Sequence, residues 1–139
     1  MLLFTVVIAF LWALYEIQIE GKSGWAGKLP TWKYKNPVKF ILNWPYIDGY
    51  HVYLFLISFL VFHVQYFIGY SFDLDNEIQI LIYYLTFLIL EDFFWFVFNR
   101  HWGIIKFFKN EIPWHAGKFL FLPKNYWVAF VLIGFLYNL

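Results

Sequence analysis

The sequence predicts an all-α, polytopic integral membrane protein with about four transmembrane helices in a single domain, residues 1–139. Hydrophobic residues make up 63% of the chain and charged residues only 14%, whereas soluble domains are about half apolar and about a quarter charged. The apolar residues also form blocks of roughly 20 residues, the helix length that crosses a bilayer. All Lys and Arg residues lie in two segments that follow the first and third of these blocks.

The first three spans are the most regular. The first is predicted over about residues 2–19. This segment lacks the basic n-region and the small-x-small cleavage site of a signal peptide, so we interpret it as a membrane span. The second covers about 50–70 and the third about 78–98. We expect Asp75 to cap the third helix and Glu77 to lie in its first turn, where a negative charge is favourable.

The fourth predicted span, about residues 119–139, is interrupted by Pro123 and Lys124. Residues 126–139 alone would form a helix of about 21 Å. Lys124 could extend its ammonium group to the interface, which would let the preceding apolar residues enter the bilayer.

The charge distribution predicts the orientation of the chain. The loop between the second and third spans contains Asp73, Asp75 and Glu77 and no basic residue. The positive-inside rule therefore places the two basic segments in the cytoplasm and both termini outside, in a multi-pass cytoplasmic membrane protein. The basic residues are Lys22, Lys28, Lys33, Lys35, Lys39, Arg100, Lys106, Lys109, Lys118 and Lys124.

The two predicted inner loops, residues 21–49 and 101–117, are rich in aromatic residues. Asn36 and Pro37 are typical of the N-cap and first position of a short helix, residues 38–44. We expect both loops to lie in the headgroup region with their rings toward the membrane, and the tryptophans to act as interface anchors.

Acidic residues and histidines gather at the inner ends of the predicted spans. A charge within the bilayer costs several kcal/mol unless it is paired, hydrated or bound to a cation, and no Lys or Arg lies inside the first three spans. The sequence therefore predicts a functional site at the inner leaflet. The residues that converge there are Glu16, Glu20, Asp48, His51, Glu91, Asp92, His101 and His115.

Two kinds of chemistry fit these residue types. Carboxylate and imidazole ligands suit iron, zinc or manganese, and the predicted ligands of a divalent metal are Glu16, His51, Glu91, Asp92 and His115. The di-iron pattern of helical bundles is incomplete, because Glu-x-x-His and dense histidine boxes are absent. Metal-free acid–base catalysis by carboxylate and histidine stays open, with Glu91, Asp92 and His115 as the predicted catalytic residues.

Some of these residues also have purely structural interpretations. Glu20 precedes Gly21 and Lys22 and is expected at the water interface, and Asp48 is expected to be the N-cap of the second span. Glu91 and Asp92 could instead form a polar network between helices. His63, in the middle of the second span, is expected to bond to a neighbouring helix.

Several motifs resemble a family of small polytopic prokaryotic membrane proteins without an assigned activity. They are Glu91–Asn99 (EDFFWFVFN), Trp114-His115, Gly49-Tyr50-His51 and the early segment Glu20–Trp32. The resemblance covers most of the chain. It implies a similar arrangement of spans and singles out His51, Glu91, Asp92 and His115, but it supplies no substrate.

The leading hypothesis is a membrane-embedded enzyme acting on a lipid or another amphipathic substrate. The alternatives are a non-catalytic subunit of a larger membrane complex and a small homo-oligomeric proton- or cation-coupled transporter. The absence of an acidic or basic tail makes nucleic acid an unsuitable partner. The absence of cysteine excludes disulfides, thiolate metal sites and a cysteine nucleophile.

Overall fold

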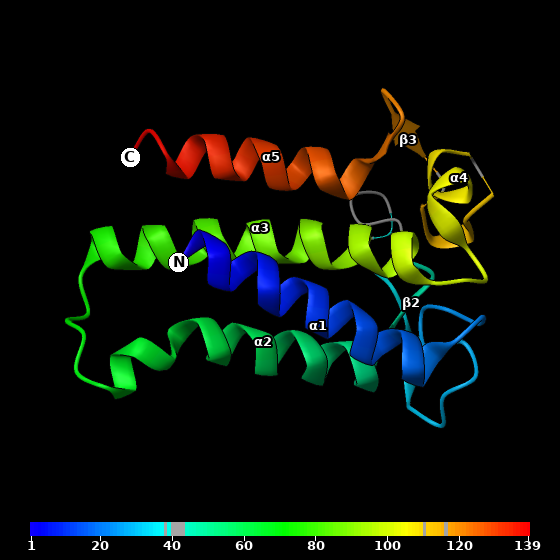
Figure 1. Cartoon of the computed structure of the whole chain (residues 1–139), viewed down its shortest axis with the longest axis horizontal. Helices are drawn as coiled ribbons and strands as arrows, with labels where there is room; N and C mark the ends of the chain where they lie inside the picture. The colour runs from blue at the N-terminus through cyan, green and yellow to red at the C-terminus, as the bar shows by residue number, and fades with distance from the viewer. Residues whose placement is uncertain (38, 40–43, 110, 116) are drawn as a thin grey trace.

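A computed structural model describes residues 1–37, 39, 44–109, 111–115 and 117–139. The long helices lie side by side, while the short elements gather at one end of the bundle (Figure 1). This confirms the helical fold class, whereas the two short strand pairs were not predicted. The elements are α1 (Leu2–Glu20), β1 (Lys33–Lys35), β2 (Tyr46–Asp48), α2 (Gly49–Phe67), α3 (Leu74–Phe98), α4 (Gly103–Phe108), the 3₁₀ turn η1 (Pro113–His115), β3 (Lys118–Phe119), β4 (Leu122–Pro123) and α5 (Lys124–Leu136).

Among the described residues, three helices are long and apolar enough to cross a membrane: α1, α2 and α3. The fourth predicted span, residues 119–139, is not confirmed as a span. Residues 118–123 form the β3–β4 hairpin, in which Lys118 pairs with Pro123 and Phe119 with Leu122. The helix therefore begins only at Lys124, and its 13 residues reach about 20 Å, less than the roughly 30 Å hydrocarbon core.

Helix α1 packs along α3 through a stripe of small side chains. Thr5, Ala9 and Ala13 are each 0% exposed, and their spacing of four residues places them on one helix face. Small residues at this spacing let two helix backbones approach closely. At the end of the pair, the side-chain amide of Asn99 donates to the carbonyl of Gly21 at 2.9 Å, which fixes the end of α1 against the end of α3.

The segment after α3 folds back onto the bundle. Phe107 of α4 is fully buried and packs with Phe96 and Trp95 of α3 and with Trp114 of η1 in one core cluster. The prediction that residues 101–117 lie flat in the headgroup region with their rings toward the membrane is therefore wrong for these side chains, because they bury against α3 instead.

The opposite end of the bundle contains the α2–α3 turn. Asp73 caps α3 by accepting a hydrogen bond from the backbone of Asn76 at 2.9 Å, so Asp75 is not the cap and lies with Glu77 in the first turn. Helix α3 begins at Leu74, about four residues before the predicted start of the span at residue 78, so Asp73 caps it and not Asp75. His63 bonds across to Glu77 of α3 at 3.2 Å, as expected for a link to a neighbouring helix.

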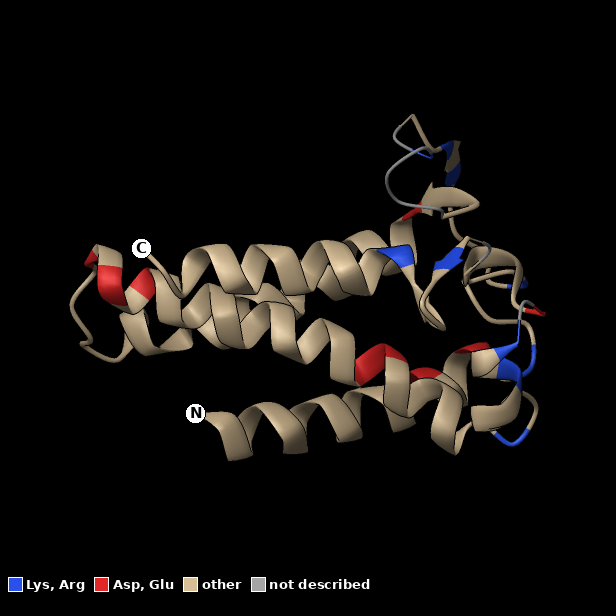
Figure 2. Cartoon of the chain, turned by 90° about the horizontal axis from the view of Figure 1, so that it is seen from above, with Lys and Arg blue, Asp and Glu red and all other residues tan. Residues whose placement is uncertain are grey.

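Basic residues lie at one end of the bundle, whereas acidic residues lie at both (Figure 2). Lys and Arg lie at the end with α4 and the short strands, while the acidic group at the opposite end lies in the α2–α3 turn and at the start of α3. In the first basic loop, β1 and β2 pair antiparallel, with Lys33 opposite Asp48 and Lys35 opposite Tyr46. The predicted short helix over residues 38–44 falls largely outside the described residues.

Candidate functional site

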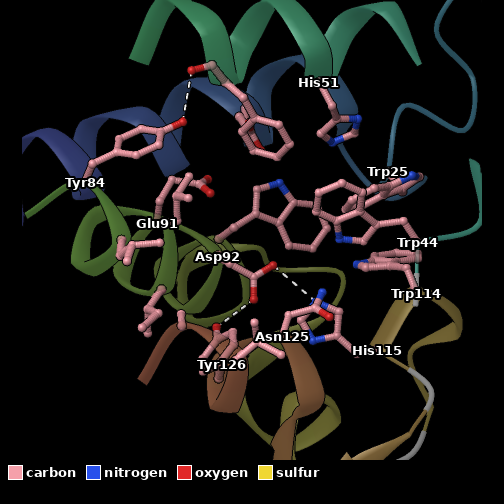
Figure 3. Close-up of a pocket in the computed structure, with 18 of the residues that line it drawn as sticks. Trp25, Trp44, His51, Tyr84, Glu91, Asp92, Trp114, His115, Asn125 and Tyr126 are labelled. Carbon is pink, nitrogen blue, oxygen red and sulfur yellow. Dashed lines mark hydrogen bonds and ion pairs between the residues drawn. The ribbon is translucent and has the colours of Figure 1, made fainter. Parts of the chain in front are cut away.

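A cavity of about 370 Å³ lies where α1, α2, α3, η1 and α5 come together at the basic end of the bundle. Its lining side chains are of two kinds, polar or aromatic and aliphatic, and Figure 3 labels several of the polar and aromatic ones. The polar and aromatic lining residues are Glu16, Glu20, Trp25, Trp44, His51, Phe55, Tyr84, Glu91, Asp92, Trp95, Trp114, His115, Asn125 and Tyr126. The aliphatic ones are Leu85, Leu88, Ile89, Val128, Ala129 and Leu132.

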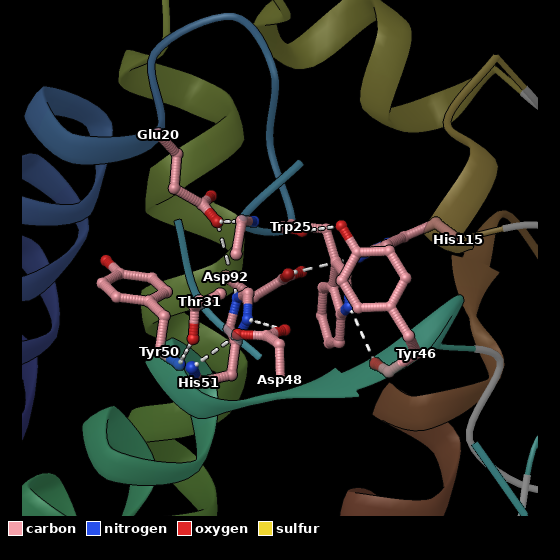
Figure 4. Close-up of polar contacts among 10 residues, drawn as sticks. Glu20, Trp25, Thr31, Tyr46, Asp48, Tyr50, His51, Asp92 and His115 are labelled. Carbon is pink, nitrogen blue, oxygen red and sulfur yellow. Dashed lines mark hydrogen bonds and ion pairs between the residues drawn. The ribbon is translucent and has the colours of Figure 1, made fainter. Parts of the chain in front are cut away.

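The first polar group is built around His51, in the first turn of α2 (Figure 4). Asp48 is 0% exposed and uses both carboxylate oxygens locally. One accepts from the backbone N–H of His51 at 3.0 Å and the other lies 2.8 Å from its ring Nδ1. The predicted N-cap role of Asp48 is confirmed, and the same side chain also holds the histidine. The other ring nitrogen, Nε2, lies 3.6 Å from Glu20.

Trp25 forms a wall behind this histidine. Its ring stacks on His51 with centroids 4.3 Å apart. Two reciprocal hydrogen bonds hold it, one from the indole N–H of Trp25 to the carbonyl of Tyr46 at 3.1 Å and one from the Tyr46 hydroxyl to the carbonyl of Trp25 at 2.7 Å. Burial, followed by the nearby charges of Asp48 and Glu20, raises the pKa of Tyr46, which keeps its hydroxyl a donor.

The loop that carries Trp25 is shaped around Glu20. Trp25 and Ala26 both have positive φ angles, 44° and 47°, a left-handed conformation that is uncommon outside glycine. The turn brings the backbone N–H of Ala26 onto the Glu20 carboxylate. Glu20 is only 8% exposed, so its predicted position in water at the interface is wrong: the left-handed turn folds the loop back over it.

The second polar group joins α3, η1 and α5. Asp92 lies 3.2 Å from Nε2 of His115 through one oxygen and accepts a 2.6 Å hydrogen bond from the Tyr126 hydroxyl through the other. His115 is 5% exposed. Its other ring nitrogen, Nδ1, is buried without a hydrogen-bond partner among the described residues.

The third polar group is a pair of carboxyl groups on adjacent helices. Glu16 of α1 and Glu91 of α3 are within hydrogen-bonding reach of each other. A hydrogen bond between two carboxyl groups requires a proton on one of them. The Oε1 atom of Glu91 is buried and has no hydrogen-bond partner in the described part of the chain.

The structure brings together all five predicted metal ligands, since Glu16, His51, Glu91, Asp92 and His115 line one cavity. It does not bring His101 there, because that side chain is exposed and the chain turns into α4 immediately after it. Sequence reasoning missed Tyr126 and the cavity-lining tryptophans, which had been expected at the membrane interface. A polar residue next to the Pro123 break was the available signal for Tyr126.

The five residues do not form a metal centre in the described part of the chain, where no group of three or more His, Asp or Glu side chains could hold an ion. The side chains instead pair off, His51 with Asp48, His115 with Asp92 and Glu16 with Glu91. The expected iron, zinc or manganese site therefore has no support from this geometry.

No family model, curated protein or solved structure matches the chain.

Proposed function

We propose that the protein is a membrane-embedded enzyme that uses two histidine–carboxylate pairs for acid–base catalysis on an amphipathic substrate. The observation that carries the proposal is that His51 and His115, each beside its own carboxylate, line one cavity that is also lined by aliphatic side chains. Cavities of 300–1,000 Å³ are typical of small-molecule sites, and the volume of about 370 Å³ lies at the lower end of that range.

His51 is suited to act as a base. The buried carboxylate of Asp48 accepts a hydrogen bond from Nδ1–H, so neutral His51 has an unprotonated Nε2. A carboxylate that fixes the tautomer of a histidine and stabilises its charged form is a recurrent arrangement in acid–base catalysis.

His115 and Asp92 form the second pair, in which the carboxylate lies beside Nε2 and not beside Nδ1 as it does at His51. Asp92 faces Nε2, which leaves Nδ1 as the nitrogen without a partner among the described residues. Neutral His51 can remove a proton from the substrate at Nε2, and His115 acts as the acid when it carries a proton on both ring nitrogens. Tyr126 holds Asp92 through its hydroxyl and acts as a positioning residue.

The membrane-spanning helices favour an amphipathic substrate, with an apolar chain and a polar group. Helices α1, α2 and α3 can cross a bilayer by length and composition, and the positive-inside rule favours a cytoplasmic position for the basic end that holds the cavity. On α5, Val128 and Leu132 line the cavity and are also 38% and 44% exposed. An apolar chain in the membrane could therefore lie along α5 with its polar group at the histidines.

The proposal is tested with purified protein in liposomes made from the total lipid extract of a prokaryotic membrane. Mass spectrometry compares the lipids after incubation with wild type, with Asp92→Asn, with His51→Asn and with Glu77→Gln, which lies at the other end of the bundle. We expect one lipid species to be converted by wild type and by Glu77→Gln, and conversion to fall by about 10²–10⁴-fold in the two cavity variants.

Conversion by wild type that the two cavity variants leave unchanged would refute the proposal. So would the absence of any converted lipid together with proton flux in the same liposomes, which would favour the transporter. Purification of a stoichiometric partner from native membranes, again without turnover, would favour the subunit.

A further inference from the structure

We propose that the polar group recognised in this cavity is an organic ammonium group that carries at least one N–H, so that the ligand is a single-chain amine amphiphile. This rests on the proposed function, because it names the substrate class of the same site. Three observations support it: the charge balance of the cavity, the unpaired oxygen of Glu91 and the tryptophan walls.

The charge balance is strongly acidic. Glu16, Glu20, Glu91 and Asp92 line the cavity, and none of its described lining residues is Lys or Arg. Even with the Glu16–Glu91 pair holding one proton and both histidines charged, the carboxylates, including Asp48 behind His51, outnumber the cationic side chains. Like charges in a site of low dielectric repel strongly, so an anionic headgroup is disfavoured and a cation is favoured.

Glu91 gives the position of that cation. Its Oε1 atom is buried and unpartnered among the described residues, the residue is only 7% exposed, and its carboxyl group points into the cavity (Figure 3). A buried acceptor without a donor costs about 1–3 kcal/mol. An ammonium N–H would satisfy it with a charge-assisted hydrogen bond, the stronger kind.

The walls suit the same ligand. Trp25, Trp44, Trp95 and Trp114 line the cavity. The faces of indole rings attract ammonium groups, and indole is the best of the aromatic side chains for this. An inorganic cation is less suited, because no three acidic or histidine side chains of the described residues converge on one point.

The number of apolar chains on the ligand follows from the shape and volume of the cavity. The aliphatic side chains of Leu88, Val128, Ala129 and Leu132 continue from the polar end along α3 and α5. An ammonium group at Glu91 would therefore direct one apolar chain between these helices. The cavity of about 370 Å³ favours one chain over the two of a bulk phospholipid.

The test is a titration of the purified full chain in phosphatidylcholine nanodiscs, followed by its tryptophan fluorescence. The probes are dodecylamine, which is protonated at neutral pH, dodecanol and dodecyl sulfate, each corrected with empty nanodiscs. We expect dodecylamine to bind about tenfold or more tightly than the other two, and Glu91→Gln to weaken dodecylamine by about tenfold without changing dodecanol.

Glu16→Gln serves as a second variant in case Glu91→Gln does not fold, and it should weaken dodecylamine in the same direction. Glu77→Gln is the matched control and should bind like wild type. Equal affinity for dodecanol, unchanged binding in a folded Glu91→Gln or Glu16→Gln variant, or displacement of dodecylamine by micromolar zinc or manganese would overturn the amine proposal. Lipid conversion that still depends on Asp92 would then leave the enzyme proposal standing.

Discussion

The two ends of the helical bundle use the same residue types in different ways. At the α2–α3 turn, both oxygens of Glu77 are engaged, one by His63 at 3.2 Å and one by the Tyr66 hydroxyl at 3.0 Å. At the cavity end, Glu91 keeps one buried oxygen without a partner among the described residues. The comparison teaches that unused hydrogen-bonding capacity in a buried place, rather than the presence of an acid or a histidine, distinguishes the candidate site.

The helix caps show the same difference. Asp73 caps α3 at the exposed turn, where it also accepts from the Ser71 hydroxyl at 2.9 Å. Asp48 caps α2 while fully buried and also holds the ring of His51. Asp73 therefore stabilises only the start of a helix, whereas Asp48 stabilises the start of a helix and also holds the ring of His51.

The largest effect is expected from Asp48→Ala. It removes the N-cap and leaves the buried Nδ1 of His51 unpaired, for a combined loss of about 2–4 kcal/mol of stability. Asp73→Ala should cost clearly less, because only the cap is lost. Thermal unfolding of both variants in detergent, followed by circular dichroism, measures the difference.

Asp48→Asn separates the two roles of this residue. Asparagine is as good an N-cap as aspartate, so the helix should keep its start while the charge beside His51 is lost. We expect stability close to wild type and a large loss of lipid conversion. Equal destabilisation by Asp48→Ala and Asp73→Ala would show that Asp48 is a cap and nothing more.

A smaller loss of stability is expected from adding a side chain at Gly24, next to the ring of Trp114. Gly24 has a φ of +54°, and a Cβ there would collide with the ring of Trp114. Gly24→Ala should therefore cost about 1–3 kcal/mol and displace this wall. Gly134→Ala is the matched control: its Cβ would meet nothing within 4 Å, and alanine in a helix is favoured by about 0.5–1 kcal/mol.

Melting temperatures and dodecylamine titrations of the two glycine variants show whether the position of Trp114 affects stability and binding in the cavity. The comparison between the ends predicts weaker binding for Gly24→Ala only. If both variants bind and melt alike, the position of Trp114 does not matter to the cavity.

The smallest effect concerns pH at the other end. The backbone N–H of Asn76, followed by the Ser71 hydroxyl, lowers the pKa of Asp73 below its ordinary value of 3.8. Its stabilising contribution is therefore complete above that ordinary value and is lost as the pH falls through the lowered one. Asp73→Asn keeps a cap but cannot titrate, so its melting temperature should fall less than that of wild type on acidification from about pH 7 to about pH 2.

Identical pH profiles for wild type and Asp73→Asn would mean that this cap carries no pH dependence. The measurement is best made with Glu77→Gln beside it, because Glu77 is a second carboxyl group in the first turn of α3.

Much of this architecture could be predicted from the sequence. The apolar blocks identified α1, α2 and α3, because a helix that crosses a bilayer must be apolar over about 20 residues. The convergence of Glu16, His51, Glu91, Asp92 and His115 followed from their positions near the ends of those blocks. Asp48 was identified as a cap because it stands directly before an apolar run.

The rest depended on contacts between distant segments. The β1–β2 pair has no apolar alternation to reveal it, and Glu20 is buried only because a left-handed turn at Trp25 and Ala26 folds over it. The cavity-lining positions of Trp25 and Trp114 depend on such contacts, since Trp25 stacks on His51 of α2 and Trp114 packs against α3. The pairing of each histidine with its own carboxylate, which removes the support for a metal centre, likewise required the fold.

The stripe of Thr5, Ala9 and Ala13 has a consequence for biogenesis. Because α1 packs mainly on α3, its principal partner helix is synthesised only after α2. Until then Glu16 has no Glu91 beside it, so stable insertion of the amino-terminal segment should be completed only after α3 has been synthesised.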